Sequence, residues 1–276
     1  MRIVKVNKDS IANILSDLLK RSPTNYGDFQ DKVDAIIKNV RDNGDKAVFD
    51  YTAQFDKAEI NAENILVTEE EIKEAYEEVD DELIKVIRKA IKNIRDFHEK
   101  QIQKSWFETR EDGVMLGQKV TPMETCGVYV PGGKAVYPSS VLMNIVPAHV
   151  AGVKNIIMTT PPGKDGKVTA NTLVAAKEAG ATKVYKVGGA QAIAAMAFGT
   201  ESIPKVDKIV GPGNIFVALA KKAVYGNVSI DSIAGPSEIL VLADETANPR
   251  YVAADLLSQA EHDEMASAIL VTTSEE

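Results

Sequence analysis

The sequence predicts an α/β fold with a mostly parallel sheet, and three observations lead to this prediction. From about Val114 onward, short apolar runs alternate with helical segments. Most of the glycine-rich turns stand where a predicted strand ends. The first hundred residues have helical rather than strand periodicity. Repeated strand–helix alternation gives right-handed crossovers and parallel strands, so we expect a Rossmann-like unit preceded by a helical region.

The helical region begins with two amphipathic segments. Apolar side chains recur at three- and four-residue steps from Val33 to Val40, and a second set begins at Ala47. Gly44 lies between them and predicts a break between two helices. Thr68 followed by Glu71 has the spacing of a capping box, which predicts another helix start.

The remaining elements follow from apolar periodicity. A long helix over 81–97 has isoleucines on one stripe and acidic residues ahead of basic ones, the order that the helix dipole favours. After it the pattern predicts strands at 127–130, 155–160, 183–187, 208–210, 239–243 and 268–272. Helices are predicted between them at 140–151, 171–178, 190–197, 214–224 and 251–260.

Glycine-rich turns mark the ends of four of these strands. They are Pro131-Gly132-Gly133, Pro161-Pro162-Gly163, Gly188-Gly189 and Gly211-Pro212-Gly213, while Gly235-Pro236-Ser237 leads into the next strand. In an open parallel sheet, ligands bind at the carboxyl ends of the strands, where helix N-termini offer free N–H donors. We therefore expect these glycines to line one shared cleft.

Composition excludes several classes of protein. The 276 residues are 45% hydrophobic and 26% charged, with a formal net charge of -8, which disfavours a dedicated nucleic-acid binder. No apolar run approaches the roughly 18 residues that a membrane-spanning helix needs. A single cysteine and a polar first ten residues favour a cytoplasmic location. The expected partner is a small molecule or another subunit.

Single residues carry weak signals when taken alone. No G-x-G-x-x-G fingerprint follows a strand, and no P-loop motif occurs. Asn214 is predicted to be a helix N-cap, and Gln191 to be an exposed residue of a first helical turn. Cys126 has no identifiable activating neighbour and is predicted to be a small buried residue. His98 ends a charged helix and His149 is predicted to pack within an apolar stretch.

Gln259 and His262 are three residues apart and would lie on one face of a helix. Histidine is a common zinc ligand, but glutamine is an unusual one, and two residues leave the coordination shell incomplete. On these residues alone, a histidine at a helix end is the favoured interpretation.

Several motifs in a fixed order resemble those of histidinol dehydrogenase. They are GVYVPGG at 127–133, VGGAQA at 187–192, KVDKIVGPGN at 205–214, AGPSE at 234–238 and DLLSQAEH at 255–262. The resemblance implies a zinc-dependent, NAD-linked enzyme of histidine biosynthesis. Such an enzyme oxidises L-histidinol through L-histidinaldehyde to L-histidine and uses two NAD for the four electrons.

The resemblance also implies roles for individual residues. Tyr129, Gln191 and Asn214 match positions that contact NAD. Ser237, Gln259 and His262 match positions that contact the substrate, and Gln259 and His262 also match two zinc ligands. These roles replace the interpretations given above for Asn214 and for the Gln259 and His262 pair.

Family members continue beyond Glu276, and the part that follows carries a Glu-His pair for proton transfer and two further zinc ligands. We therefore assign no catalytic residue here and expect little or no turnover from this chain by itself. We also expect the incomplete first domain to expose apolar surface.

The family is a homodimer of subunits with two Rossmann-like domains. That organisation implies an N-terminal helical arm at 1–25, a discontinuous and incomplete first domain at 26–125 and 237–276, and a second domain at 126–236. Two alternatives stay open: a non-catalytic nucleotide-binding or subunit-interaction module, and another NAD(P)-linked alcohol or aldehyde dehydrogenase. Substrate profiling and NADH formation with histidinol separate the three.

Overall fold

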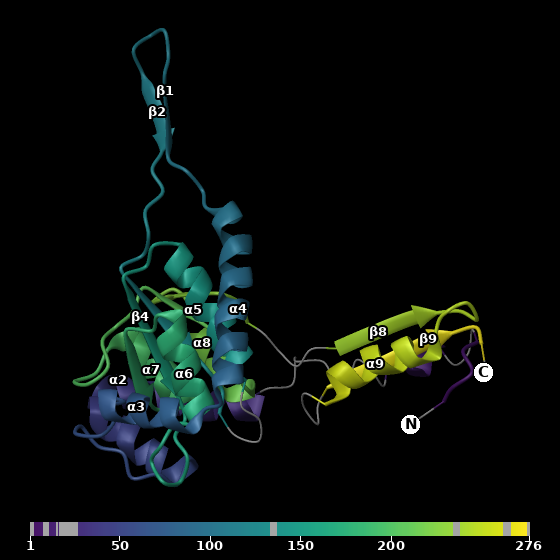
Figure 1. Cartoon of the computed structure of the whole chain (residues 1–276), viewed down its shortest axis with the longest axis horizontal. Helices are drawn as coiled ribbons and strands as arrows, with labels where there is room; N and C mark the ends of the chain where they lie inside the picture. Colours follow the sequence, from purple (N-terminus) through teal and green to yellow (C-terminus); the bar gives the residue numbers. More distant parts are fainter. Residues whose placement is uncertain are drawn as a thin grey trace.

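Five parallel strands form the central sheet of the computed structural model (Figure 1), which describes residues 3–7, 11–14, 16, 27–132, 137–233, 238–261 and 266–274. The order across the sheet is β5-β4-β3-β6-β7. The strands are β3 (Thr125–Tyr129), β4 (Asn155–Thr160), β5 (Lys183–Lys186), β6 (Lys208–Val210) and β7 (Ser229–Ile230). Counted along this unit, the order is third, second, first, fourth and fifth, which is the Rossmann order.

Helices connect these strands as predicted. They are α5 (Pro138–Val150), α6 (Ala170–Ala179), α7 (Gly189–Phe198) and α8 (Ile215–Val224). The register aligns Cys126 of β3 with Ile156 of β4 on one side and with Lys208 of β6 on the other. The α/β prediction with a parallel sheet and a helical N-terminal region is confirmed.

Each face of the sheet has its own hydrophobic core. Side chains of β3 alternate between the cores, so that Tyr129 joins one core and Val128 the other. The Tyr129 core includes α7, α8 and the long helix α2 (Gly27–Phe55). The Val128 core includes α5 and α6 with α3 (Glu69–Glu78) and α4 (Asp81–His98), which is followed by the short helix η2 (Glu99–Gln101).

Gly44 breaks α2 where the sequence predicts a break between two helices. Its φ of 54° and ψ of -136° are non-helical, and only glycine adopts this region without strain. A side chain at this position would also collide with the carboxylate of Glu201. That carboxylate accepts a hydrogen bond from the backbone N–H of Asp45 at 2.8 Å, which ties α2 to the loop after α7.

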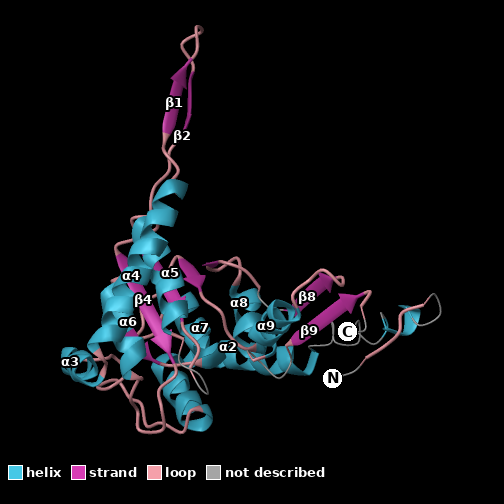
Figure 2. Cartoon of the chain, turned by 45° about the vertical axis from the view of Figure 1, so that its right-hand side comes forward, coloured by secondary structure: helices cyan, strands magenta, loops and turns pink. Residues whose placement is uncertain are grey.

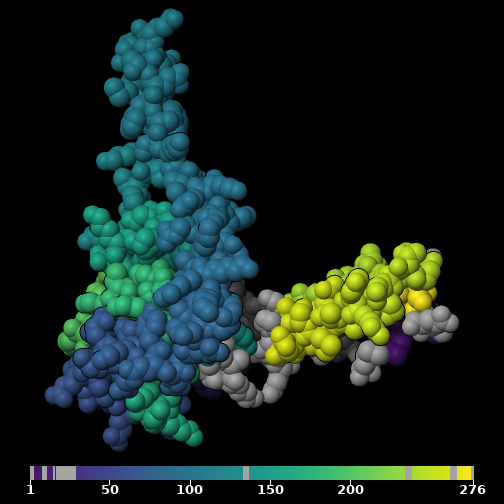
Figure 3. Space-filling view, viewed as in Figure 1, coloured from purple at the N-terminus to yellow at the C-terminus, as the bar shows by residue number. Residues whose placement is uncertain are grey.

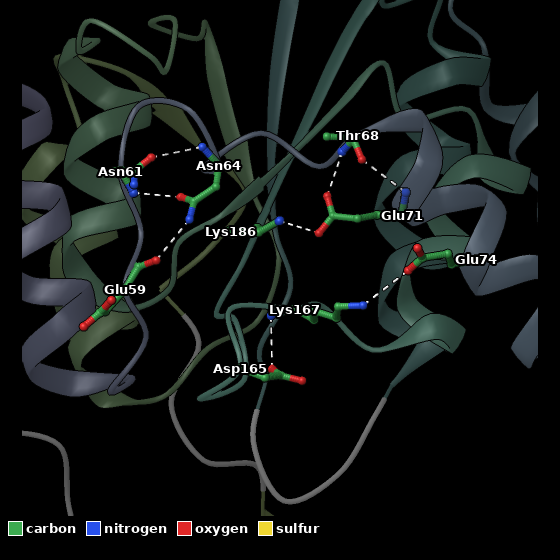
Figure 4. Close-up of polar contacts among 9 residues, drawn as sticks. All are labelled: Glu59, Asn61, Asn64, Thr68, Glu71, Glu74, Asp165, Lys167 and Lys186. Carbon is green, nitrogen blue, oxygen red and sulfur yellow. Dashed lines mark hydrogen bonds and ion pairs between the residues drawn. The ribbon is translucent and has the colours of Figure 1, made fainter.

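The predicted capping box opens α3 and fastens it to the sheet (Figure 4). Thr68 Oγ1 accepts from the Glu71 N–H at 3.1 Å, and Glu71 Oε2 accepts from the Thr68 N–H at 2.8 Å. The other Glu71 oxygen pairs with Lys186, the last residue of β5, whose side chain is only 6% exposed. Burial favours a higher Glu71 pKa, but the bonds from Lys186 and Thr68 outweigh it and lower this pKa. In the same view, Lys167 reaches Glu74 at 3.2 Å and joins the loop after β4 to α3.

A two-stranded antiparallel hairpin projects from the body (Figures 1 and 3). It consists of β1 (Trp106–Thr109) and β2 (Met115–Gln118), and every residue in both strands is exposed. The exposed side chains include Phe107 at 64% and Met115 at 68%. Sequence patterning does not predict this hairpin.

The last described segments form a small parallel β-α-β unit that Figures 1 and 2 show beside the main body. It contains β8 (Glu238–Ala243), α9 (Pro249–Ala260) and β9 (Ser267–Thr272), with Leu240 of β8 opposite Ile269 of β9. The domain boundaries given above stay predictions. In this structure, the helices α2, α3 and α4 pack on the sheet of β3 to β7. Most of the proposed 1–25 arm lies outside the described residues, and no helix in the described ranges has the length and apolar content to cross a membrane.

Candidate functional site

The candidate site lies at the carboxyl edge of the central sheet, between β3 and β6. The chain leaves β3 toward β4 and β5 on one side, while β6 and β7 extend the sheet on the other. This reversal is the topological switch point, where open α/β sheets bind ligands. Tyr129 is the last residue of β3, and Gly211 directly follows β6.

Four of the glycine-rich turns meet at this edge, as the sequence predicts. A methyl group added at Gly132 or at Gly188 would lie 2.5 Å from the ring of Pro161. One added at Gly211, whose φ is 116°, would lie 2.0 Å from the carbonyl oxygen of Tyr129. These contacts require glycine and bring the turns after β3, β4, β5 and β6 together.

The shared cleft expected between these turns stays a prediction. Two cavities in the described part of the chain are not lined by these turns. One of about 710 Å³ is lined by residues that include Cys126, Met143 and Asp231, and another of about 570 Å³ lies in the β8 and β9 unit.

Tyr129 links the turns after β3 and β5. Its hydroxyl oxygen accepts a hydrogen bond from the backbone N–H of Gly189 at 3.1 Å, and its side chain is buried. Burial raises the pKa of Tyr129 to about 12; the Gly189 bond lowers it and the charge of Asp56 raises it. The phenol therefore stays protonated near neutral pH and retains a proton to donate.

Gln191 is 1% exposed, so the prediction that it is an exposed first-turn residue is wrong. The reason is that α7 is covered on all sides: it lies in one core between the sheet, α2 and α8. Neither Gln191 Oε1 nor Nε2 has a hydrogen-bond partner. Its Oε1 lies close to Gly189, 2.6 Å from where a Cβ would stand. A buried amide without partners is costly and needs an explanation, and a ligand is one.

Asn214 is the N-cap of α8, the interpretation that its sequence position alone favours, while its role in NAD binding stays a prediction. Its Oδ1 accepts from the N–H groups of Phe216 at 3.1 Å and Val217 at 3.2 Å. This use of the oxygen leaves the Nδ2 group as the part of the side chain suited to donate to a ligand.

Lys221 and Asp231 hold the turn that precedes Asn214. Lys221 Nζ donates to the carbonyl of Gly211 at 2.9 Å, and the Gly211 N–H donates to Asp231 Oδ2 at 2.9 Å. Lys221, only 2% exposed, also forms an ion pair with Asp231. Buried Lys221 and the more exposed Asp231 therefore fix both backbone groups of Gly211.

Asp56, directly after α2, is a residue that the sequence analysis missed. Its Oδ2 is buried without a hydrogen-bond partner, and burial raises its pKa to about 6. Ala58, two residues on, belongs to the same core as Tyr129, and the charge of Asp56 contributes to the raised pKa of Tyr129. One aspartate after a helical pattern is ordinary, so the sequence contains no signal for this position.

The structure brings together Tyr129, Gln191 and the turn that leads to Asn214, but not Gln259. Gln259 is half-buried on α9, which Figure 1 shows apart from the central sheet. Ser237 and His262 lie outside the described residues. No three His, Cys, Asp or Glu side chains of the described ranges are grouped to hold a metal ion. The described residues alone therefore do not form a zinc site.

The cysteine and the two described histidines, Cys126, His98 and His149, lie outside the candidate site. Cys126 lies within β3 rather than before it, and burial raises its pKa to about 11, so it stays a thiol, in line with a packing role. His98 Nδ1 lies 2.7 Å from Gln101 Oε1. The prediction that His149 packs within an apolar stretch is wrong, because its side chain is exposed, with its ring near Gly180 at the end of α6.

The strand order defines a Rossmann-like α/β protein, and its candidate ligand-binding site lies at the topological switch point. The sequence model of the histidinol dehydrogenase family matches residues 19–276. The chain is 58% identical over 275 residues to histidinol dehydrogenase of Halalkalibacterium halodurans, covering 99% of this chain and 63% of that protein. It is 60% identical over 272 residues to histidinol dehydrogenase of Bacillus subtilis, with 98% and 63% covered.

A solved structure agrees with these sequence matches. The crystal structure of histidinol dehydrogenase from Elizabethkingia anophelis superposes with a TM-score of 0.86 at 44% identity, covering 95% of this chain and 60% of that one. The chain belongs to the histidinol dehydrogenase family. It spans about three-fifths of the length of the relatives it matches.

Proposed function

We propose that the whole protein is an NAD-dependent histidinol dehydrogenase of histidine biosynthesis. It would oxidise L-histidinol to L-histidinaldehyde and then to L-histidine, transferring four electrons to two NAD. Family membership and the names of relatives at 58% and 60% identity support this proposal. A cytoplasmic location belongs to the same proposal and rests on the biosynthetic role.

The single observation that carries the cofactor part of the proposal is the buried, unpartnered amide of Gln191 at the switch point. It offers one donor group and one acceptor to a dinucleotide. Two helix N-termini, those of α7 and α8, begin at the same edge, and their positive dipole ends suit a pyrophosphate. These residues fit NAD.

Three side chains would hold the cofactor. Gln191 would bind it through the unpartnered amide, Tyr129 through its remaining hydroxyl proton, and Asn214 through Nδ2. The glycine turns let backbone approach the ligand closely. Bound NAD would supply the hydride acceptor, and the chain's own residues would orient it and exclude water.

The substrate and zinc parts of the proposal rest on the family resemblance. Ser237, Gln259 and His262 would contact the substrate, and Gln259 Oε1 with a His262 ring nitrogen would contribute two zinc ligands. Further ligands would have to come from outside the described residues.

The test is histidinol-dependent NADH formation by the full-length gene product, followed by absorbance. We expect L-histidine and two NADH for each L-histidinol. Tyr129→Phe is expected to raise the KM for NAD about tenfold with a smaller change in kcat, because one hydroxyl bond to the cofactor is lost. Oxidation of other alcohols, with none of histidinol, would contradict the proposal.

We also propose that the protein is a homodimer. The projecting hairpin supports this, because an isolated two-stranded hairpin is marginally stable in water and this one exposes large apolar side chains on both faces. A second subunit would cover it.

A further inference from the structure

Asp56 is placed where folding alone disfavours a carboxylate. It follows the last residue of α2, and its backbone N–H donates to the carbonyl of Thr52 at 2.9 Å, so the side chain meets the negative end of the helix dipole. Its Oδ2 is buried and has no hydrogen-bond partner. Its nearest basic neighbour in sequence, Lys57, donates instead to the carbonyl of Gln54 at 2.7 Å. A ligand that brings donors would relieve each of these penalties.

Asp56 lies next to the core that contains the proposed cofactor residues, because Ala58, two residues on, belongs to the same core as Tyr129. The Tyr129 hydroxyl accepts from the Gly189 N–H, and Gly189 lies against the Gln191 amide. The charge of Asp56 contributes to the raised pKa of Tyr129. Asp56 and Gln191 are the only described residues with buried side-chain polar atoms that lack partners. Gln191 is on α7 and Asp56 is two residues before Ala58, and both α7 and Ala58 belong to the core that contains Tyr129. One ligand bound there would therefore supply partners to both side chains.

The chemistry of a carboxylate selects the part of the ligand that it meets. An ionised carboxylate only accepts hydrogen bonds, and bonds from hydroxyl groups to it are short and strong. A phosphate beside it would be repelled. In a dinucleotide, the pyrophosphate suits the N-termini of α7 and α8, while the ribose hydroxyls suit Asp56.

The dinucleotide has two riboses, one on the adenosine half and one on the nicotinamide half, and the elements around the site distinguish them. Residues proposed to contact the substrate, and hence the reactive half of the cofactor, belong to the 237–262 segment. Asp56 belongs to α2, which packs on α7 and α8. Because α2 carries none of the residues proposed to contact the substrate, we assign the adenosine half of the cofactor to Asp56.

We propose that the Asp56 carboxylate binds the hydroxyl groups of the adenosine ribose and makes the site select NAD over a dinucleotide with a 2′-phosphate. This inference rests on the proposed function, because it assumes that a dinucleotide binds at the switch point. It adds a specificity-determining residue that lies outside the glycine-rich turns.

The test is calorimetric titration of the full-length gene product with NAD and with NADP, for the parent and for Asp56→Asn. We expect the variant to bind NAD about tenfold more weakly and the ratio of NAD to NADP affinity to fall at least tenfold. Asp50→Asn, which removes an exposed carboxylate on the same helix, is the control and is expected to leave both affinities unchanged.

The outcomes separate this inference from the proposed function. If the parent binds neither dinucleotide, the proposed function fails and the role of Asp56 fails with it. If the parent binds NAD and Asp56→Asn keeps the same affinity ratio, the ribose assignment is wrong while the function stands. A role in folding alone would change the melting temperature and leave that ratio unaltered.

Discussion

Gln191 shows how a residue can be unfavourable for stability and still suit binding. Its amide is buried at 1% exposure, and both polar atoms lack partners. An apolar side chain of the same length removes the penalty of the unpaired amide. Stability and cofactor binding should therefore change in opposite directions on substitution.

Gln191→Met is expected to raise the free energy of unfolding by about 1 kcal/mol and to weaken NAD binding about tenfold. Urea unfolding and calorimetric titration measure the two quantities. Gln54→Met on the exposed side of α2 is the matched control, with little change in either. A destabilised Gln191→Met protein would show that the amide has a partner in solution.

Asp56 makes stability depend on pH. Its pKa rises from the usual 3.8 to about 6, so between these values the folded state binds more protons than the unfolded state, and stability falls as pH rises. Above about pH 6 the penalty is fully present, and below about pH 4 it is absent. After allowance for partial exposure, the penalty is about 1 kcal/mol.

Asp56→Asn should therefore stabilise the protein without ligand by about 1 kcal/mol at about pH 8 and by almost nothing at about pH 4. Denaturant unfolding at the two pH values checks this. An equal effect at both values would mean that the Asp56 pKa is ordinary.

At the scale of elements, the turn after β6 depends on the ion pair between buried Lys221 and Asp231. Lys221 holds the Gly211 carbonyl and pairs with Asp231, which in turn holds the Gly211 N–H. Since Gly211 starts the turn that places Asn214, this pair connects the packing of α8 with the proposed cofactor site.

Lys221→Met is expected to cost about 2 kcal/mol of unfolding free energy, because Asp231 loses its charge partner, and to weaken NAD binding as well. Adding Asp231→Asn should restore part of the stability, since no unpaired charge is left. If the double variant is less stable than Lys221→Met alone, the two side chains do not act as a pair.

Helices and strands were predictable where the hydrophobic periodicity of the sequence matches the side of the element that is buried in the fold. The strands and helices from 125 to 224 carry clear periods and end at glycines with a geometric requirement, such as Gly211. The hairpin of β1 and β2 was missed because all of its residues are exposed, so no alternation exists. Gly113 after Asp112, a common hairpin turn, was the signal available.

The site was only partly predictable for a different reason. The N-cap role of Asn214 is local and follows from sequence. The burial of Gln191 depends on α2 lying over α7, and the position of Asp56 depends on the same packing. These are long-range contacts between distant segments, which a local pattern does not contain.

At the scale of the molecule, exposed apolar surface gathers on two projecting parts. These are the hairpin and the small unit of β8, α9 and β9, where Leu240 and Leu242 are exposed. Parallel strands are normally covered on both faces. The surfaces therefore favour assembly.

Replacing Trp106 and Phe107 by serine is expected to shift a dimer toward monomer by removing apolar contact area. Sedimentation velocity of the full-length gene product measures this shift. Val86→Ser, which removes an exposed apolar side chain of α4, is the control. If the mass of the double variant equals that of the parent, the hairpin is not the interface.

A crystal structure with bound NAD tests the location of the cofactor most directly. The dinucleotide is predicted to lie across the carboxyl ends of β3 and β6, with Gln191 and Asn214 in hydrogen-bond contact and the adenosine ribose at Asp56. Density for NAD in the cavity beside Cys126, or in the β8 and β9 unit, would contradict a cofactor site at the switch point.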